Sequence, residues 1–389
     1  MKILLVTNNY FIRGNGLASS ARRTVKKLIE AGEEVRVVSG PNPYKDDPKP
    51  DYELKVFHFP FFQWLIYKQG FLFAKFNKKV LKEAIEWADV VHLEDPFVLQ
   101  IKTAKLARKM HKVCTGTYHL HPENIFNSIH LGKSRLLNGI MMRIWKKQIF
   151  NHCEIVQCPT QNVYERLVRH HFKAELRIIS NGLLTEELMQ RTEEVSKTNE
   201  TNDAKYRIIT IGRYSVEKSL KTLLKAMKYS KYAKETQLII AGKGPKERRL
   251  KKRADKYLKK GFIKYPVIFG FYQFNDLQQI SSTADLYVHC AFVEVEGLSC
   301  MEAIQIGLVP IIAEGKYTAT PQFALSEKSL YKQKDAKDLA SKIDYWFDHD
   351  EERKTEAKKY FGIGEKYNID YSIKELRKMF KDAYKKYNK

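Results

Sequence analysis

Three glutamates surround a Gly-Leu-Ser turn in the stretch EVEGLSCMEAIQIG, residues 294–307, which follows the apolar run LYVHCAF. The spacing after Gly297 is helical, so the backbone N–H groups of Leu298 and Ser299 would lack partners inside the helix and could receive phosphate oxygens. Glu302, about one turn into that helix, could accept hydrogen bonds from the vicinal hydroxyls of a sugar or ribose. The stretch therefore predicts a site for an anionic, hydroxyl-rich ligand.

Two cations stand in a second loop, IGRYSVEKSLKTLLKAM, which also follows an apolar run. Gly212 allows a tight turn there, and Arg213 and Lys218 flank the start of a helix. Fixed positive charge and the helix dipole act in the same direction on a diphosphate, so this loop is a candidate for binding one. The alternative is that both are ordinary surface residues of a lysine-rich chain.

Two further glycine loops repeat this geometry after later apolar runs. In AGKGPKERRL, Lys243 lies between Gly242 and a second glycine. In VIFGFYQFNDL, Gly270 precedes Phe271, where a flat base could lie against the chain. The alternative interpretation of the aromatic residues is core packing.

The amino-terminal half offers a weaker glycine loop and a histidine. NNYFIRGNGLASSA places Gly16 just before a helix, where backbone N–H groups could approach a phosphate. A dinucleotide fingerprint would need a third glycine, where Ser19 stands, and an acidic residue after the second strand, so NAD binding is not expected. His119 follows a predicted strand in TGTYHLHPENI, although a lone histidine is more often structural than catalytic.

The chain has 389 residues and a formal charge of +24, from 69 basic and 45 acidic residues. Such a charge attracts anions, including nucleotides, nucleic acids and acidic lipids. No apolar run approaches the ~18 residues of a membrane-spanning helix, and MKILLVTNNYF resembles a first strand more than a signal peptide. Five scattered cysteines without a CxxC pair fit a reducing compartment, so we expect a cytoplasmic protein. No metal site is predicted, because the DHD at residues 348–350 precedes a helical segment and suits capping better.

Apolar, β-branched runs alternate with segments of helical spacing, which predicts parallel sheets covered on both faces. The polar stretch EELMQRTEEVSKTNETNDAKY separates two such halves. We therefore expect an α/β protein with two Rossmann-like, doubly wound domains facing each other across a cleft: residues 1–187, a linker at 188–204, residues 205–365, and a basic amphipathic helix in 366–389. The predicted strands are 3–7, 35–39, 90–93, 113–117, 154–158, 177–179, 208–211, 238–241, 267–269, 286–289 and 309–313.

The chain resembles family 4 of the retaining glycosyltransferases, which have the GT-B fold. Three motifs carry this resemblance by their order: GRYSVEK, GKGP and the E-x7-E pair of Glu294 and Glu302. GLSCMEAIQIGLVPII is similar to the continuation of that motif, and ISNGL to the turn that ends the first domain. The resemblance spans nearly the whole chain. It implies that the last helix crosses back to the first domain, which binds the acceptor.

Residue roles follow from the same resemblance. Arg213 and Lys218 would hold the diphosphate of a nucleoside diphosphate sugar, Glu302 the ribose hydroxyls, and Glu294 the transferred sugar. Gly16 and the amides of Leu298 and Ser299 would approach the distal phosphate, and His119 the sugar and phosphate from the opposite domain. The implied reaction is a front-face displacement with retention, without a metal cofactor or a covalent intermediate. RGNGLASS departs from many family members by having Asn15 in place of a second adjacent glycine.

Basic and aromatic residues concentrate in FPFFQWLIYKQGFLFAKFNKKVLK and SRLLNGIMMRIWKKQIF. A face combining Trp64, Phe71, Phe73 and Phe76 with lysines 68, 75, 78 and 79 could enter an anionic headgroup layer. This hypothesis predicts peripheral binding to the inner face of the cytoplasmic membrane and a lipid or lipid-linked glycan acceptor for the cell envelope. The alternative is a core helix with a solvated lysine face.

Two other functions remain open from sequence. A sugar-nucleotide epimerase of the same fold would convert a donor without an acceptor. A basic nucleic-acid-binding protein would use the same charge and aromatic residues, but it would not need the glutamates around Gly297, so we expect no nucleic-acid partner.

Overall fold

The computed structural model describes residues 1–44, 49–60, 63–68, 70–184 and 203–388. The chain divides into two compact units, one formed by Met1–Gly182 with Ile369–Lys389 and the other by Leu183–Asn368. The linker predicted at 188–204 lies outside the described residues except for positions 203 and 204. Among the described helices, none is long and apolar enough to cross a bilayer.

Unit 1 is built on a seven-stranded sheet with the order β3-β2-β1-β4-β5-β6-β7. All of its strand pairs are parallel. The central strands are almost continuously apolar because helices cover both faces, and every residue of β4 is buried. The strands are β1 (Lys2–Val6), β2 (Glu34–Ser39), β3 (Tyr52–Glu53), β4 (Val90–Leu93), β5 (Val113–Thr117), β6 (Ile155–Cys158) and β7 (Glu175–Ile178).

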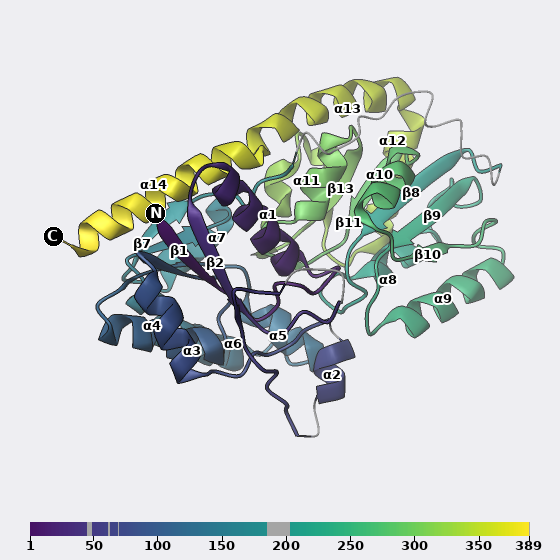
Figure 1. Cartoon of the computed structure of the whole chain (residues 1–389). Coiled ribbons are helices and arrows are strands. Elements are labelled where there is room, and N and C mark those ends of the chain that lie inside the picture. The colour runs from purple at the N-terminus through teal and green to yellow at the C-terminus, as the bar shows by residue number, and fades with distance from the viewer. Residues whose placement is uncertain (45–48, 61–62, 69, 185–202, 389) are drawn as a thin grey trace. The chain divides into compact units, whose positions relative to one another are not determined.

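Helices lie on both faces of this sheet, with α1 and α14 on one face and α3, α4 and α6 on the other (Figure 1). The helices of unit 1 are α1 (Gly16–Glu30), α2 (Gln63–Lys68), α3 (Lys78–Trp87), α4 (Val98–Lys109), α5 (Pro122–Ser128), α6 (Arg135–Gln148), α7 (Gln161–Arg169) and α14 (Ile369–Tyr387).

The carboxyl-terminal helix α14 belongs to unit 1, although all of unit 2 precedes it in the chain. It packs against α1 and β5, and its apolar face is buried. Four ion pairs fix its position: Arg377 with Glu33 at 2.6 Å, Asp382 with Arg177 at 2.7 Å, Asp370 with Lys27 at 3.2 Å, and Lys386 with Glu175 at 3.5 Å. The expected return of the last helix to the first domain is therefore confirmed.

Unit 2 contains a six-stranded sheet with the order β10-β9-β8-β11-β13-β15. All pairs are again parallel, and β12 with β14 forms a separate two-stranded parallel ladder. The strands are β8 (Tyr206–Ile211), β9 (Thr236–Ala241), β10 (Ile268–Gly270), β11 (Leu286–His289), β12 (Val293–Glu294), β13 (Val309–Glu314), β14 (Tyr317–Thr318) and β15 (Leu330–Lys332).

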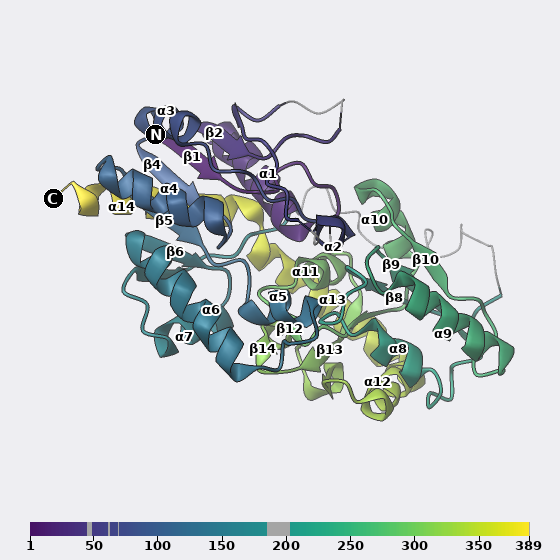
Figure 2. The ribbon, with the colours of Figure 1, turned by 90° about the horizontal axis from the view of Figure 1, so that it is seen from below.

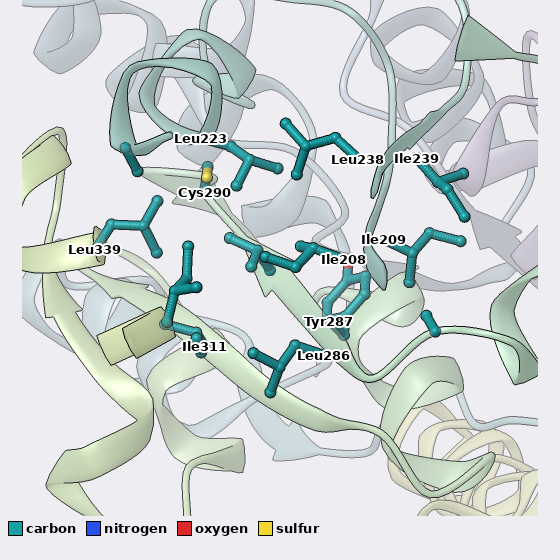
Figure 3. Packing of buried hydrophobic residues seen from close by; sticks show 14 of the residues in the cluster. Ile208, Ile209, Leu223, Leu238, Ile239, Leu286, Tyr287, Cys290, Ile311 and Leu339 are labelled. Carbon is teal, nitrogen blue, oxygen red and sulfur yellow. The ribbon is translucent and has the colours of Figure 1, made fainter. Parts of the chain in front are cut away.

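Aliphatic side chains from these strands and from the covering helices make a continuous core, which includes Ile208, Leu223, Leu286, Ile311 and Leu339 (Figure 3). The helices of unit 2 are labelled in Figure 2. They are α8 (Leu220–Ala226), α9 (Glu247–Lys259), α10 (Phe274–Ser282), α11 (Leu298–Gln305), α12 (Ala336–Asp348) and α13 (Asp350–Gly364).

The predicted fold class is confirmed in both units. Each of the eleven predicted strands lies within two residues of an observed strand. In both sheets the first strand of the unit sits between the second and the fourth, which is the Rossmann order. Parallel sheets of this order bind ligands where the order reverses, at the carboxyl ends of these central strands. In unit 1 that point lies between β1 and β4, and in unit 2 between β8 and β11.

Candidate functional site

The first cluster of polar residues in unit 2 joins Lys218 to Glu294. Lys218 follows β8 and Glu294 ends β12, and their side chains form an ion pair at the carboxyl end of the sheet. The backbone holds the two loops together, because Phe292 N–H donates to the carbonyl of Glu217 at 3.0 Å and Ala319 N–H donates to the carbonyl of Glu294 at 3.0 Å. The structure therefore brings together two residues predicted separately from sequence.

The electrostatics of this pair keep Glu294 ionised. Burial alone would raise the pKa of Glu294, but the charge of Lys218 and the hydrogen bond and charge of His289 outweigh it and lower the pKa to about 2. Both partners lie against Oε2, since His289 Nε2 is 3.6 Å from the same oxygen. The second carboxylate oxygen makes no hydrogen bond to the described residues, so it is available to accept one from a ligand hydroxyl.

His289 is the last residue of β11 and is fully buried. Its Nδ1 lies 3.0 Å from the hydroxyl of Tyr287, which in turn lies 3.0 Å from Ser299 Oγ in the first turn of α11. Burial has the largest effect and lowers the pKa of His289, and the charge of Lys218 lowers it further, while the hydrogen bond and charge of Glu294 act in the opposite direction. This row of side chains connects Glu294 to the amino end of α11.

Arg213 lies in the same loop as Lys218 and forms its own buried contact. Its Nη2 donates to Glu217 Oε1 at 2.7 Å, and Ser215 Oγ donates to the same oxygen at 2.6 Å. Glu217 is buried, whereas Arg213 is about one-third exposed. One side of the guanidinium is thus fixed by a carboxylate.

The glycines of three neighbouring loops allow close backbone contacts in unit 2. A Cβ on Gly242, whose φ is +144°, would lie 2.1 Å from the carbonyl oxygen of Gly212. Gly242 N–H donates to the carbonyl of Gly270 at 2.6 Å, and Gly212 N–H donates to the carbonyl of Ala241 at 2.9 Å. These predicted ligand-binding glycines therefore join the loops that follow β8, β9 and β10.

Lys243 and Phe271 lie next to these glycines, and the structure places them in contact. The ammonium group of Lys243 stands 4.0 Å from the centre of the Phe271 ring, which is partly exposed. A base stacking on the same face of the ring would have to displace this lysine.

Helix α11 begins directly after Gly297, whose φ is +91°. A side chain at Gly297 would be strained in this conformation, and its Cβ would lie 2.2 Å from Thr320 Cγ2. Leu298 and Ser299 occupy the first turn, where helix geometry provides no carbonyl for their N–H groups. Glu302 lies one turn further along the same helix. The predicted turn and helix start are confirmed as structure; their ligands stay a prediction.

In unit 1, His119 lies just beyond the end of β5 and is held by a carboxylate that the sequence did not indicate. His119 Nε2 is 2.6 Å from Glu94 Oε2, and His92 Nε2 is 3.4 Å from Glu94 Oε1. Burial would raise the pKa of Glu94, but the charge and hydrogen bonds of His119 and His92 lower it well below its usual range. Glu94 is therefore a buried anion between two imidazoles at the carboxyl end of β4.

Asn15 caps α1, so N–H groups at the amino end of this helix, which were expected to approach a phosphate, already have a side-chain partner. The Asn15 side chain accepts from the N–H groups of Leu17 at 3.0 Å and Ala18 at 3.3 Å. Gly16 is the first residue of the helix, and a Cβ there would meet open space. The departure noted at Asn15 thus has a local cause: the amide oxygen occupies two of the N–H groups that a phosphate would use.

Sequence reasoning missed Glu94, Glu217, Tyr287 and His289. Their partners lie 25, 4, 12 and 5 positions away along the chain. Glu217 stands within the quoted stretch GRYSVEK, so a search for carboxylates next to the candidate cations would have found it. Within the described part of the chain, no group of three or more His, Cys, Asp or Glu residues could hold a metal ion.

Two family models match this chain in succession. The model described as Glycosyltransferase Family 4 matches residues 14–187, and the model described as Glycosyl transferases group 1 matches residues 191–360. The chain belongs to glycosyltransferase family 4. It is therefore a glycosyltransferase with the GT-B fold, which sets aside the epimerase and nucleic-acid-binding hypotheses.

Curated relatives of this glycosyltransferase include two alpha-monoglucosyldiacylglycerol synthases. The protein from Acholeplasma laidlawii is 26% identical over 80% of this chain and 80% of its own length. The protein from Streptococcus pneumoniae is 24% identical over 81% of this chain and 71% of its own length.

One solved structure agrees on the fold over nearly the whole chain, and a second is similar in sequence over part of it. Anabaena HepE, in complex with UDP and glucose, has a TM-score of 0.77 at 14% identity and covers 98% of this glycosyltransferase and 100% of its own chain. The catalytic domain of cholesterol-alpha-glucosyltransferase from Helicobacter pylori is 40% identical, covers 42% of this chain and 99% of its own, and has a TM-score of 0.37.

If His119 contacts substrate, Glu94 should act through it, and this gives a prediction within unit 1. We expect Glu94→Gln to lower kcat about 10- to 100-fold, because a charge-assisted hydrogen bond that fixes a functional group contributes about 1.5–3 kcal/mol. His119→Ala should have an effect at least as large. In the double variant the two effects should not add, because Glu94 has no function without the ring.

Steady-state kinetics of the two single variants and the double variant measure this coupling. Glu123→Gln serves as a control for the loss of a buried carboxylate, because Glu123 is also buried and pairs with Arg166 at 2.9 Å in the same unit. Effects of Glu94→Gln and His119→Ala that multiply in the double variant would contradict the assignment of Glu94 as a positioning residue.

Proposed function

We propose that this glycosyltransferase moves a sugar from a nucleoside diphosphate sugar to a lipid or lipid-linked glycan, with retention of the anomeric configuration. The names of two relatives, alpha-monoglucosyldiacylglycerol synthases, support a lipid acceptor. The HepE complex with UDP and glucose supports a nucleotide-sugar donor. The observation that carries the proposal is the Lys218–Glu294 ion pair, which places a cation and an ionised carboxylate together at the carboxyl end of the unit 2 sheet.

The proposed chemistry stabilises the leaving group. As the bond from the sugar to the phosphate oxygen breaks, negative charge develops on the diphosphate, and Arg213, Lys218 and the amides of Leu298 and Ser299 supply fixed positive partners. The second oxygen of Glu294 accepts a hydrogen bond from a hydroxyl of the transferred sugar. The acceptor hydroxyl attacks from the side of the departing phosphate, which receives the acceptor's proton.

The reaction needs no metal in this proposal, because the side-chain cations and helix amides provide the charge that a divalent ion would otherwise supply. Full activity in excess EDTA, after removal of divalent ions by dialysis, is the expected result. A loss of activity that Mg²⁺ or Mn²⁺ restores would assign that charge to a metal instead.

Glu302 is assigned to the ribose hydroxyls, and its replacement gives a prediction about binding. We expect Glu302→Ala to weaken binding of the donor nucleotide about 10- to 100-fold, because a hydrogen bond to a charged acceptor contributes about 1.5–3 kcal/mol. Isothermal titration calorimetry with nucleoside diphosphates measures the change. Glu314→Ala, at the exposed end of β13, should bind as the wild type does. Wild-type affinity in Glu302→Ala would remove the ribose assignment.

The enzyme is proposed to work on the inner face of the cytoplasmic membrane as a peripheral protein, in the synthesis of envelope glycolipids. The formal charge of +24 supports attraction to an anionic bilayer. The names of the two relatives give a glycolipid as the product, and the lipid acceptor of such a reaction would lie in a membrane.

One experiment tests the function directly. The protein is incubated with a panel of nucleoside diphosphate sugars and with diacylglycerol, glucosyldiacylglycerol or a sterol in vesicles. Free nucleoside diphosphate and a glycosylated lipid whose anomeric configuration matches the donor are expected. Donor conversion without transfer to any lipid would contradict the lipid acceptor, and an inverted product would contradict retention.

A further inference from the structure

Helix α6 carries an exposed apolar stripe that the proposed catalytic chemistry does not use. Leu136, Ile140 and Ile144 are four residues apart and therefore lie on one side of the helix. Their exposed fractions are 71%, 42% and 41%. The opposite side holds Met142 and Trp145, which are buried in unit 1.

The stripe continues into the loop before the helix, where Ile129 and Leu131 are exposed by 49% and 47%. Single exposed apolar residues are common on protein surfaces, but five in one sixteen-residue segment form a patch of the kind that marks an interaction surface. We call Ile129, Leu131, Leu136, Ile140 and Ile144 the α6 stripe.

The exposed charged residues that flank the α6 stripe are all cationic. Lys133, Arg135, Arg143 and Lys147 are exposed, and residues 129–149 contain no aspartate or glutamate. Figure 2 shows α6 beside α5, and α6 packs against both α5 and α4. The solvent-facing side of α6 therefore combines long aliphatic side chains with positive charge.

The aromatic segment that the sequence favoured for membrane contact has a different structure. It does not form one helix, because α2 ends at Lys68 and the chain beyond Gly70 is extended until α3 begins. Phe71 and Phe73 are half-buried and pack against Phe97, at 5.1 and 4.9 Å between ring centres. The alternative of one core helix is therefore wrong, whereas the hypothesis that these aromatic residues and lysines contact a membrane stays a prediction.

We propose that the α6 stripe lies in the headgroup region of a bilayer that contains anionic lipid. Helices with aliphatic residues on one side and flanking lysine and arginine bind in this way, the apolar side chains entering the acyl boundary and the cations contacting lipid phosphates. The inference rests on the proposed lipid acceptor for its role, since a surface helix would hold the enzyme where that acceptor lies.

A second copy of this chain is a poorer occupant of the stripe. A two-fold contact through α6 would place each helix against its own copy, and the four cations on each would meet like charges with no acidic residue between 129 and 149 to balance them. Anionic phosphates, in contrast, are complementary to all four.

Sedimentation with vesicles tests the proposal with the full-length protein. The triple variant Leu136→Gln/Ile140→Gln/Ile144→Gln should bind vesicles of phosphatidylglycerol and phosphatidylcholine at least 10-fold more weakly than the wild type. Arg143→Gln/Lys147→Gln should lose about 10-fold, and only with the anionic vesicles. Glutamine preserves helix propensity, and circular dichroism confirms that each variant is folded.

A matched control exists in the same unit. Ile29→Gln/Val98→Gln/Val168→Gln changes three aliphatic side chains with exposed fractions of 53%, 59% and 49%, on α1, α4 and α7. This control should bind vesicles as the wild type does. Equal loss in both triple variants would show a general effect of surface polarity and would overturn the proposal.

Catalysis provides a separate measurement. Transfer to an acceptor in vesicles should fall in the α6 triple variant, while transfer to the same acceptor dispersed in detergent should not change. If neither the wild type nor any variant transfers sugar to an acceptor, the proposed function is rejected. The vesicle sedimentation does not depend on transfer and still tests the membrane surface. Wild-type vesicle binding by the α6 triple variant, or a wild-type dimer that this variant dissociates in light scattering, would reject the membrane surface.

Discussion

Replacing Lys218 with alanine is expected to lower kcat about 100-fold. In the proposed reaction Lys218 stabilises charge that develops on the leaving diphosphate, and loss of one such fixed partner costs about 2.7–4 kcal/mol of transition-state stabilisation. The substitution also removes the positive charge with which Glu294 forms its ion pair. Both members of the pair are thus affected, so we expect the effect to exceed that of any other single surface lysine.

The same variant should change how stability depends on pH. In the wild type, burial raises the pKa of Glu294, but Lys218 and His289 lower it to about 2, against its usual value of 4.5. A carboxyl with a lowered pKa stabilises the folded state above the unfolded value and loses this contribution as the pH falls toward about 2. Without Lys218 the effect of burial dominates, so unfolding in acid should begin at a higher pH.

Lys221→Ala is the matched control, because Lys221 is the second residue of α8 and is exposed. Steady-state kinetics and thermal unfolding between about pH 3 and pH 8 should give wild-type values for this control. Unchanged kcat in Lys218→Ala, or equal losses in both variants, would remove the diphosphate assignment.

Gly242→Ala is the second substitution with a large expected effect, this time on stability. Its φ of +144° disfavours any side chain, and the new Cβ would lie 2.1 Å from the carbonyl oxygen of Gly212 and 3.3 Å from the Tyr214 ring. Backbone strain alone costs about 1–3 kcal/mol, and the contact with backbone cannot be relieved by a rotamer change. We expect unit 2 to lose about 3 kcal/mol or more, together with donor binding.

Gly261→Ala separates the two causes, because Gly261 also has a positive φ, +67°, but a Cβ there meets nothing within 4 Å. Its cost should be about 1 kcal/mol, which reflects conformation without a steric clash. Thermal or urea unfolding followed by circular dichroism measures both variants. Similar midpoints for Gly242→Ala and Gly261→Ala would show that the loops after β8 and β9 can separate, contrary to the close contact described above.

The sheets were predictable from sequence because parallel strands buried on both faces consist of short apolar runs, as in Val90–Leu93 and Leu286–His289. The strands that sequence did not indicate are β3, β12, β14 and β15, which have two or three residues each. Segments this short have no periodicity to detect, and tertiary contacts alone make them strands.

The part of the candidate site around Gly297 was predictable, because one short motif holds its proposed ligand-binding residues within about one helical turn. The buried carboxylate Glu94 was not predictable, because its two histidine partners come from different parts of the chain. His92 lies in β4, just before Glu94, and His119 lies beyond β5. Similarly, the contact of Gly242 with Gly212 joins loops 30 residues apart, and composition cannot show which glycine approaches which carbonyl. Pairings of this kind depend on strand order, which local sequence does not encode.

The origin of α14 has a consequence for biosynthesis. Unit 1 receives this helix only after the ribosome has translated every residue of unit 2, although the other elements of unit 1 emerge first. Until then the nascent sheet has one face without its final cover, around β5 and α1. The later unit can therefore complete its core first, and a nascent chain stalled before Ile369 should bind holdase chaperones through its earlier half.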